Sequence, residues 1–287
     1  MIIVTGANGK LGRATVERLL ERLPADQIGV SVRDPERARD LQRRGVRVRQ
    51  GDFNEAAGLA HAFEGASRVL LVSSNTGGEG TVRQHQTAID AAGAAGAGHI
   101  FYTSHAGADL ISAFPPARSH AATEVALRDS GLAYTSLRNG YYAQTAVMLV
   151  QGALRTGELR APQDGPINYT AHPDLAEATA IALTDGGEGD TILTLTGPEA
   201  MDTAGLAALA SELTGRRIRR VVVPDDEFRA GLVAQGVPGP RAALLLGMFV
   251  AARQGAFTRV DPTLARLIGR PPTSVREVLK AAISPAG

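Results

Sequence analysis

The stretch TGANGKLG, residues 5–12, decides the fold class of this chain. It places Gly6, Gly9 and Gly12 directly after a short apolar run and directly before a helical pattern. In such a strand–loop–helix unit, the first glycine permits a tight turn, the second lets backbone N–H groups approach a pyrophosphate, and the third allows the helix to pack closely on the sheet. The helix N-terminus then offers unpaired N–H groups and the positive end of its dipole to phosphates. The stretch therefore predicts a dinucleotide site.

A triphosphate-binding loop is excluded because it needs the pattern G-x-x-x-x-G-K-[ST]. Here Gly9 and Lys10 are followed by Leu11, and Val4 stands where the first glycine would be. Lys10 is open to two interpretations: it adds positive charge near the phosphates, or it is a solvated loop residue.

Outward from this loop, strand-like and helix-like segments alternate through the first two-thirds of the chain. Apolar and alternating runs predict strands at residues 1–4, 28–32, 46–48, 69–72, 100–103 and 133–137. Helical spacing predicts helices over residues 11–23, 54–63, 82–95 and 117–130. This rhythm is typical of an α/β fold with a Rossmann-type, doubly wound parallel sheet.

After about residue 150 the rhythm changes. We expect a loop over residues 157–166, a helix over 175–184, and strands at 191–195 and 219–223, with most of the remainder helical. The chain is thus predicted to divide into a Rossmann domain that binds NAD(P), residues 1–155, and a smaller, mostly helical C-terminal lobe on the substrate side, residues 156–287. Some segments of this lobe are expected to return to the core sheet.

Composition narrows the class of protein further. The chain has 287 residues, of which 44% are hydrophobic and 21% charged, and its net charge is +1. That balance gives no basic footprint for nucleic acid or an acidic membrane. Cysteine is absent, which excludes disulfides, thiolate metal sites and cysteine nucleophiles. The histidines show no metal-ligand spacing, so we predict no metal. We expect a cytoplasmic protein with a small-molecule substrate.

The second predicted strand ends in the residues that should choose between NAD and NADP. Arg33 offers a fork for a 2′-phosphate, whereas Asp34 offers a carboxylate for ribose hydroxyls. Asp34 followed by Pro35 also reads as a helix N-cap with proline at the first helical position. Because Asp34 has this local role and Arg33 has none, we favour NADP.

A common catalytic pair is missing. Many dehydrogenases with this loop use Tyr-x-x-x-Lys, in which the tyrosine transfers the substrate proton and the lysine lowers its pKa. The lysines of this chain are Lys10 and Lys280, and neither lies four residues after a tyrosine. An epimerase, dehydratase or alcohol dehydrogenase of that mechanism is therefore not expected.

The helix where that pair would stand contains His120 and Glu124, which share a helical face at spacing i, i+4. They form either a proton relay at the pocket or a surface helix pair, and the sequence leaves both open.

These features together resemble the NmrA-like branch of atypical short-chain dehydrogenases, and within it the NADPH-dependent quinone oxidoreductases of type 2 and the triphenylmethane reductases. The matching stretches run through the whole chain: TGANGKLG (5–12), VRDP (32–35), VRQGDF (48–53), LLVSS (70–74), QH (84–85), YTS (102–104), TEVALRDSGLAYTSLRNGYY (123–142) and LIGRPPT (267–273).

The resemblance implies that NADP(H) binds along the carboxyl edge of the sheet. The cofactor residues that it implies are Gly6, Ala7, Asn8, Gly9, Lys10 and Leu11 at the pyrophosphate, Arg33 at the 2′-phosphate, Ser73, Ser74 and Asn75 along the ribose, and Asn139, Gly140 and Tyr141 near the nicotinamide.

The resemblance also implies an enzyme that passes a hydride from the nicotinamide directly to a quinone. Such an acceptor is already electrophilic, so the protein mainly has to stack two rings and exclude water. His105, His120, Tyr141 and Tyr142 are candidate pocket residues, and we take His120 and Tyr141 as the catalytic candidates. Two alternatives remain: a reductase of dye, azo, nitro or enone compounds, and a regulator that senses NADP(H) without turning it over.

Overall fold

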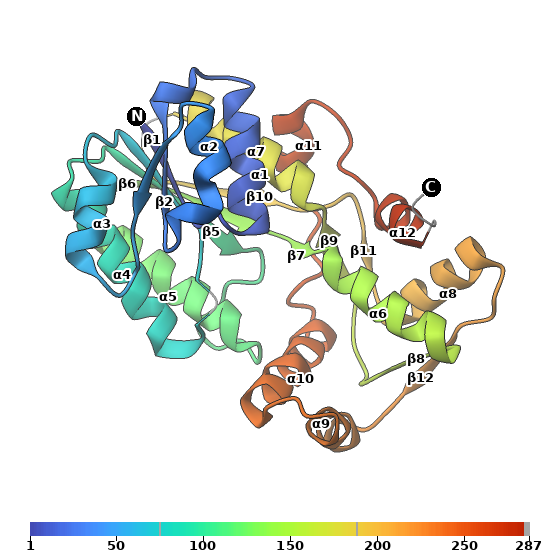
Figure 1. The fold of residues 1–287 in the computed structure, drawn as a ribbon. Coiled ribbons are helices and arrows are strands. Elements are labelled where there is room, and N and C mark those ends of the chain that lie inside the picture. The colour runs from blue at the N-terminus through green and yellow to red at the C-terminus, as the bar shows by residue number, and fades with distance from the viewer. Residues whose placement is uncertain (75, 188, 284–287) are drawn as a thin grey trace.

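A computed structural model describes residues 1–74, 76–187 and 189–283. Its centre is a seven-stranded parallel sheet in the order β10-β6-β5-β4-β1-β2-β3 (Figure 1). The strands are β1 (Ile2–Thr5), β2 (Ile28–Val32), β3 (Arg47–Gln50), β4 (Arg68–Leu71), β5 (His99–His105), β6 (Ala133–Asn139), β7 (Tyr141–Tyr142), β8 (Glu158–Ala161), β9 (Ile167–Thr170), β10 (Thr191–Leu195), β11 (Ala200–Met201) and β12 (Arg219–Val222). The prediction of a Rossmann-type, doubly wound α/β fold is confirmed.

Helices cover both faces of this sheet, as its continuous apolar strands require. The α-helices are α1 (Lys10–Leu20), α2 (Arg39–Arg43), α3 (Ala56–Phe63), α4 (Gly78–Ala94), α5 (Pro115–Asp129), α6 (Gln144–Thr156), α7 (His172–Asp185), α8 (Thr203–Thr214), α9 (Asp225–Ala234), α10 (Gly239–Arg253), α11 (Thr263–Ile268) and α12 (Val275–Ile283). Two short 3-10 helices are η1 (Ala25–Gln27) and η2 (Pro35–Ala38). One apolar cluster joins α1, α7 and α11 to the sheet, and another joins α3, α4 and α5 to it.

The strand order reverses beside β1. From β1 the chain moves outward to β2 and β3, and it then crosses back to β4 on the other side and continues to β5, β6 and β10. Ligands of open α/β sheets bind in the crevice at such a reversal, outside the carboxyl ends of the strands. The glycine loop after β1 therefore lies at the expected ligand position.

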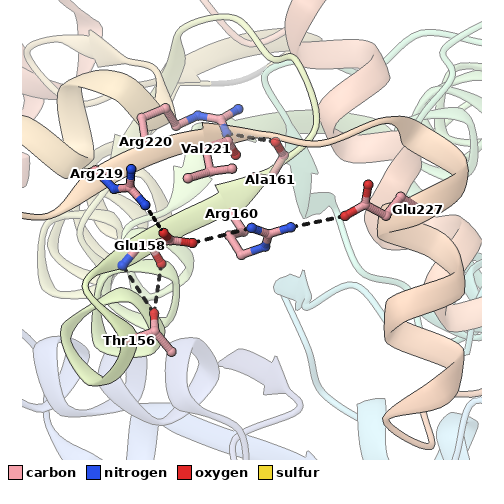
Figure 2. Close-up of polar contacts among 8 residues, drawn as sticks. All are labelled: Thr156, Glu158, Arg160, Ala161, Arg219, Arg220, Val221 and Glu227. Atoms are coloured by element: carbon pink, nitrogen blue, oxygen red, sulfur yellow. Dashed lines mark hydrogen bonds and ion pairs between the residues drawn. The ribbon is translucent and has the colours of Figure 1, made fainter.

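The C-terminal part of the chain builds a third apolar cluster around α6, α8, α10 and α12 (Figure 1). Beside it lie a three-stranded sheet, β11-β9-β7, and a two-stranded parallel sheet, β12-β8. Figure 2 shows how charged side chains join this last sheet to α9: Glu158 meets Arg219 and Arg160, and Arg160 reaches Glu227 at 3.1 Å. These pairs are exposed, so their role is to position α9 more than to stabilise the fold.

Several short strands were not foreseen. The sequence predicted a loop over residues 157–166, yet residues 158–161 form β8, and β7, β9 and β11 were not predicted at all. The reason is that β8 is flanked by glycine and proline and pairs with β12, about sixty residues further along the chain. Such pairing leaves no signal in a local window.

The division at residues 155 and 156 stays a prediction, although β10 does return to the main sheet, where it pairs with β6. Across the part of the chain that the structure describes, no helix is long and apolar enough to cross a membrane.

Candidate functional site

The glycine loop turns sharply between β1 and α1. Gly6 has φ +64°, a conformation that favours glycine, and its carbonyl accepts the N–H of Gly9 at 2.9 Å. A Cβ on Gly12 would lie 2.5 Å from the carbonyl oxygen of Gly6, so only glycine lets α1 approach the loop this closely. These two roles agree with the sequence argument.

Gly9 differs from the other two glycines because its side is open. A Cβ there would meet the carbonyl oxygen of Gly6 at 3.3 Å and no other heavy atom of the described residues within 4 Å. Gly9 is also the N-cap of α1, whose first turn carries no acidic residue. The open space therefore faces unpaired helix N–H groups, which is the environment that a phosphate prefers.

Beyond β2, Asp34 takes the capping role that the sequence suggested, whereas the role of Arg33 stays a prediction. The Asp34 carboxylate accepts the N–H of Glu36 at 3.1 Å and caps η2. The amide of Asn8 in the glycine loop donates to the carbonyl oxygen of Asp34 at 2.8 Å, which joins the two loops. The Arg33 side chain is exposed and makes no hydrogen bond or ion pair within the described residues. Its guanidinium remains available at the carboxyl end of β2.

The loop after β4 is hydrogen-bonded to side chains of β5 and α4. The N–H of Ser73 donates to Thr103 Oγ1 at 2.8 Å, and the N–H of Ser74 donates to His85 Nε2 at 2.9 Å. Ser74 Oγ also donates to Gln84 at 2.7 Å. The QH pair of the sequence thus shapes this loop, a role that the sequence alone did not reveal. The third predicted residue here, Asn75, lies outside the described residues.

Two histidines to which the sequence assigned no role in the site, His85 and His172, also lie at this edge. His85 has its other nitrogen, Nδ1, 2.8 Å from Thr123 Oγ1, and burial lowers the pKa of His85 to about 4. His172, at the start of α7, stacks at an angle against Tyr142 with ring centroids 4.3 Å apart. Burial and, to a smaller extent, the charge of Lys10 lower the pKa of His172. Lys10 therefore lies close to α7, which no local pattern could have indicated.

At the end of β6, Asn139 is 1% exposed, and neither its side-chain oxygen nor its nitrogen has a partner among the described residues. Gly140 follows, and a Cβ there would lie 2.2 Å from Thr170 Oγ1, so this glycine is required by packing. Tyr141 is half-buried, and burial raises the pKa of its hydroxyl.

His120 and Glu124 do not form the surface pair that was one of the two alternatives. His120 Nδ1 shares a hydrogen bond of 2.8 Å with the hydroxyl of Tyr102, and burial lowers the pKa of His120 to about 4. Glu124 is buried, which excludes a surface pair, and its carboxylate is bound by Arg138 at 2.6 Å and by the hydroxyls of Ser104 and Ser136. Glu124 thus ties α5 to the sheet, and His120 of the same helix is bonded to Tyr102 of β5.

Most of the buried side-chain polar atoms that have no partner within the described residues lie at this same edge. Within the described residues they belong to Asn8, Ser31, His105, Asn139 and Tyr169. The first four of these residues follow, or lie near the carboxyl ends of, β1, β2, β5 and β6. Since native proteins rarely leave buried polar groups unpaired, this edge is prepared for a polar ligand. A dinucleotide with its phosphates at Gly9 fits the arrangement. Over the described residues, no cluster of three or more His, Asp or Glu could hold a metal ion.

Comparison with known proteins also indicates that this chain binds a nicotinamide dinucleotide. A model of the NAD(P)H-binding family matches residues 6–186. The chain is 36% identical to quinone oxidoreductase 2 of Escherichia coli over 278 residues, which are 96% of each protein.

Solved structures agree. The crystal structure of the E. coli NADPH-dependent quinone oxidoreductase QOR2 with NADPH superposes with a TM-score of 0.94 at 35% identity, covering 99% of this chain and all of the other. The Citrobacter sp. triphenylmethane reductase with NADP(H) gives 0.91 at 33% identity, covering 99% of this chain and all of the other.

Proposed function

The chain belongs to the NAD(P)H-binding family, and from this premise we propose that it is an NADPH-dependent oxidoreductase that passes a hydride directly to a quinone or quinone-like acceptor. The observation that carries the proposal is a cluster of aromatic rings beside the unpaired Asn139. The ring centroid of Tyr141 lies 5.5 Å from that of Phe257, 5.8 Å from that of Phe114 and 5.5 Å from that of His105. A flat, apolar acceptor is suited to such walls.

The cofactor would lie along the carboxyl edge. We propose that residues 6–11 hold the pyrophosphate, with Lys10 adding charge beside His172, and that Arg33 binds the 2′-phosphate. Ser73, Ser74 and Asn75 would follow the ribose. At the other end, the buried amide of Asn139, with both its oxygen and its nitrogen unpaired, suits the carboxamide of a nicotinamide.

When bound, NADPH supplies a hydride, which together with one proton from water converts a quinone to a hydroquinone. The protein orients the acceptor between aromatic rings and excludes water, and it needs no Tyr-x-x-x-Lys pair for this. We propose that Tyr141 stacks against the acceptor and that His120 relays a proton. Because the pKa of His120 is about 4, its ring is neutral at pH 7, and Tyr102 at its Nδ1 is the group that can exchange a proton with it.

The substrate is proposed to be a small molecule. The net charge of +1 gives no support for a nucleic-acid partner. We propose a cytoplasmic location for the enzyme.

The test is oxidation of NADPH by the purified protein, followed by the absorbance of the reduced nicotinamide, with and without a panel of simple quinones. NADH at the same concentration is the control. Quinone-dependent oxidation that favours NADPH supports the proposal. If triphenylmethane dyes, azo, nitro or enone compounds support NADPH oxidation and none of the quinones does, the proposed hydride transfer stands but the acceptor is of another class. Tight binding of NADP(H) without turnover on any acceptor would overturn the proposal in favour of a nucleotide sensor.

A further inference from the structure

His105, the last residue of β5, carries a hydrogen-bond donor with no acceptor. Its Nδ1 accepts the backbone N–H of Gly107 at 2.9 Å, so in the neutral ring the hydrogen is on Nε2. That Nε2 is buried and has no partner within the described residues. An unpaired buried donor costs about 1–3 kcal/mol. The arrangement therefore calls for an oxygen or a similar acceptor atom to complete it.

The ring of His105 stays neutral. Burial and, to a smaller extent, the nearby His120 together lower its pKa to about 3. At pH 6–8 the ring is thus a fixed N–H donor, with its tautomer set by Gly107. It does not serve as an imidazolium that gives up a proton.

The surroundings of the ring suit a carbonyl group. The ring centroids of Phe257 and Tyr141 lie 5.2 and 5.5 Å away, both edge to face, so two of the walls are aromatic rings. A cavity of about 10 Å³ lies beside His105 and these two rings, and Asn168 and Arg259 also line it. That volume is close to the minimum that holds a single water molecule, and hence a single oxygen atom.

We propose that the Nε2–H of His105 donates a hydrogen bond to a carbonyl oxygen of the acceptor, and that the cavity beside the ring receives this oxygen. The inference rests on the proposed reduction of quinones. The hydride forms a bond to the other carbonyl oxygen of the quinone, the ring becomes aromatic, and the electron pair of the C=O π bond beside His105 moves onto its oxygen, which becomes an oxyanion. A proton from water then converts this oxyanion to the second hydroxyl of the hydroquinone. His105 keeps its own proton throughout. The hydrogen bond strengthens as charge develops, so it lowers the barrier more than it tightens ground-state binding.

Two amide variants separate the donor from the rest of the ring. In His105→Asn the side-chain oxygen still accepts from Gly107, but no N–H reaches the position of Nε2. In His105→Gln the amide nitrogen occupies that position and restores the donor. With 1,4-naphthoquinone and NADPH, we expect His105→Asn to lower kcat about 100-fold with a KM change of only a few-fold, the loss seen when an oxyanion donor is removed. His105→Gln should recover most of the rate.

A second measurement is independent of turnover. Calorimetry with the NADP⁺-loaded protein and 1,4-naphthoquinone reports binding alone, and the absence of cysteine removes thiol addition as a side reaction. We expect binding about 5-fold weaker for His105→Asn than for the wild type, which corresponds to about 1 kcal/mol. His99→Gln is the control, because His99 is buried at the other end of the same strand and is bonded to Thr135 at 2.8 Å.

The outcomes are distinct. Equal kcat for wild type and His105→Asn, with normal quinone turnover, would mean that water alone fills the cavity and would overturn the inference while leaving the proposed function intact. Equal losses for the Asn and Gln variants would also overturn it, since a packing role does not depend on the donor. If none of the quinones tested supports oxidation of NADPH by the wild-type protein, the proposed function is overturned and this inference with it.

Discussion

Arg33 illustrates what a single exposed side chain contributes when its neighbour already has a structural role. Asp34 caps η2, and the Arg33 guanidinium is unpaired within the described residues, which supports the proposal that Arg33 binds the 2′-phosphate. A charge-assisted, forked hydrogen bond contributes about 1.5–3 kcal/mol. We expect Arg33→Ala to raise the Kd for NADPH about 10- to 100-fold and the Kd for NADH by less than about 3-fold.

The matched control is Arg128→Ala, an exposed arginine near the end of α5. It should leave both dissociation constants unchanged. Equal weakening of NADPH and NADH by the Arg33 substitution would remove this residue from the 2′-phosphate site.

A second expectation concerns proton transfer by His120. If His120 relays a proton to the reduced acceptor, His120→Ala should lower kcat for quinones about 10-fold, at the low end of general acid catalysis because water also supplies protons. The Kd for NADPH, measured by the fluorescence of the reduced nicotinamide, should stay the same. Unchanged kcat would leave His120 with a packing role against Tyr102.

The roles of residues that contact their neighbours in the sequence could be predicted. The roles of residues whose partners are far away in the sequence could not. Asp34 was predicted as an N-cap, and it is one, because capping involves only the next few residues. His85 and His172 were missed as parts of the site. The first meets Ser74 and Thr123, and the second meets Tyr142, and neither contact leaves a local signal.

Among the elements, the strands of the main sheet were predicted most closely, since β2 and β10 match the predicted ranges at both ends. Their apolar, β-branched runs are bounded by turn residues, which is a local signal. The two-residue strands β7 and β11 exist only because a third strand, β9, brings them together. The motif LIGRPPT was noted from the sequence, but its role became visible only in the structure.

The motif LIGRPPT, residues 267–273, holds the segment between α11 and α12 against α7. The buried carboxylate of Asp174 on α7 accepts Arg270 at 2.8 Å and the backbone N–H of Thr273 at 2.7 Å. We expect Asp174→Ala to lower the free energy of unfolding by about 2 kcal/mol, because the N–H of Thr273 loses its charged acceptor. Urea unfolding measures the loss, and faster hydrogen exchange at Thr273 locates it.

Glu177→Ala provides the comparison, because Glu177 binds the same Arg270 at 2.6 Å but is half-buried. Its loss should cost no more than about 1 kcal/mol. If the two variants lose equal stability, the buried position of Asp174 is not what stabilises this segment.

For the whole molecule, buried histidines set the response to acid. His85, His105 and His120 have pKa values near 4, 3 and 4, against about 6.5 for an unfolded chain. Their folded pKa values are depressed, so the unfolded state takes up more protons as the pH falls below 6.5. Stability is therefore complete above pH 6.5 and is lost progressively toward pH 4. Each such histidine contributes a slope of about 1.4 kcal/mol per pH unit once its unfolded form is protonated.

Urea unfolding at several pH values between 7 and 5 measures this slope. In His85→Gln one of these groups is gone, so the slope should fall by up to about 1.4 kcal/mol per pH unit. A slope that does not change would show that His85 is not neutral in the folded protein.

The pairing of β10 with β6 has a consequence for how the chain is made. A ribosome releases the N-terminal strands first, and β6 emerges with one edge unpaired until residues 191–195 have followed. The helix α7, which packs against α1 in the apolar cluster that joins both helices to the main sheet, also comes from beyond residue 155. Nascent chains that end near residue 155 therefore hold the residues of the proposed nucleotide site on an unfinished sheet. Such an open edge invites pairing with other chains, so this interval of synthesis is where a chaperone would be most useful.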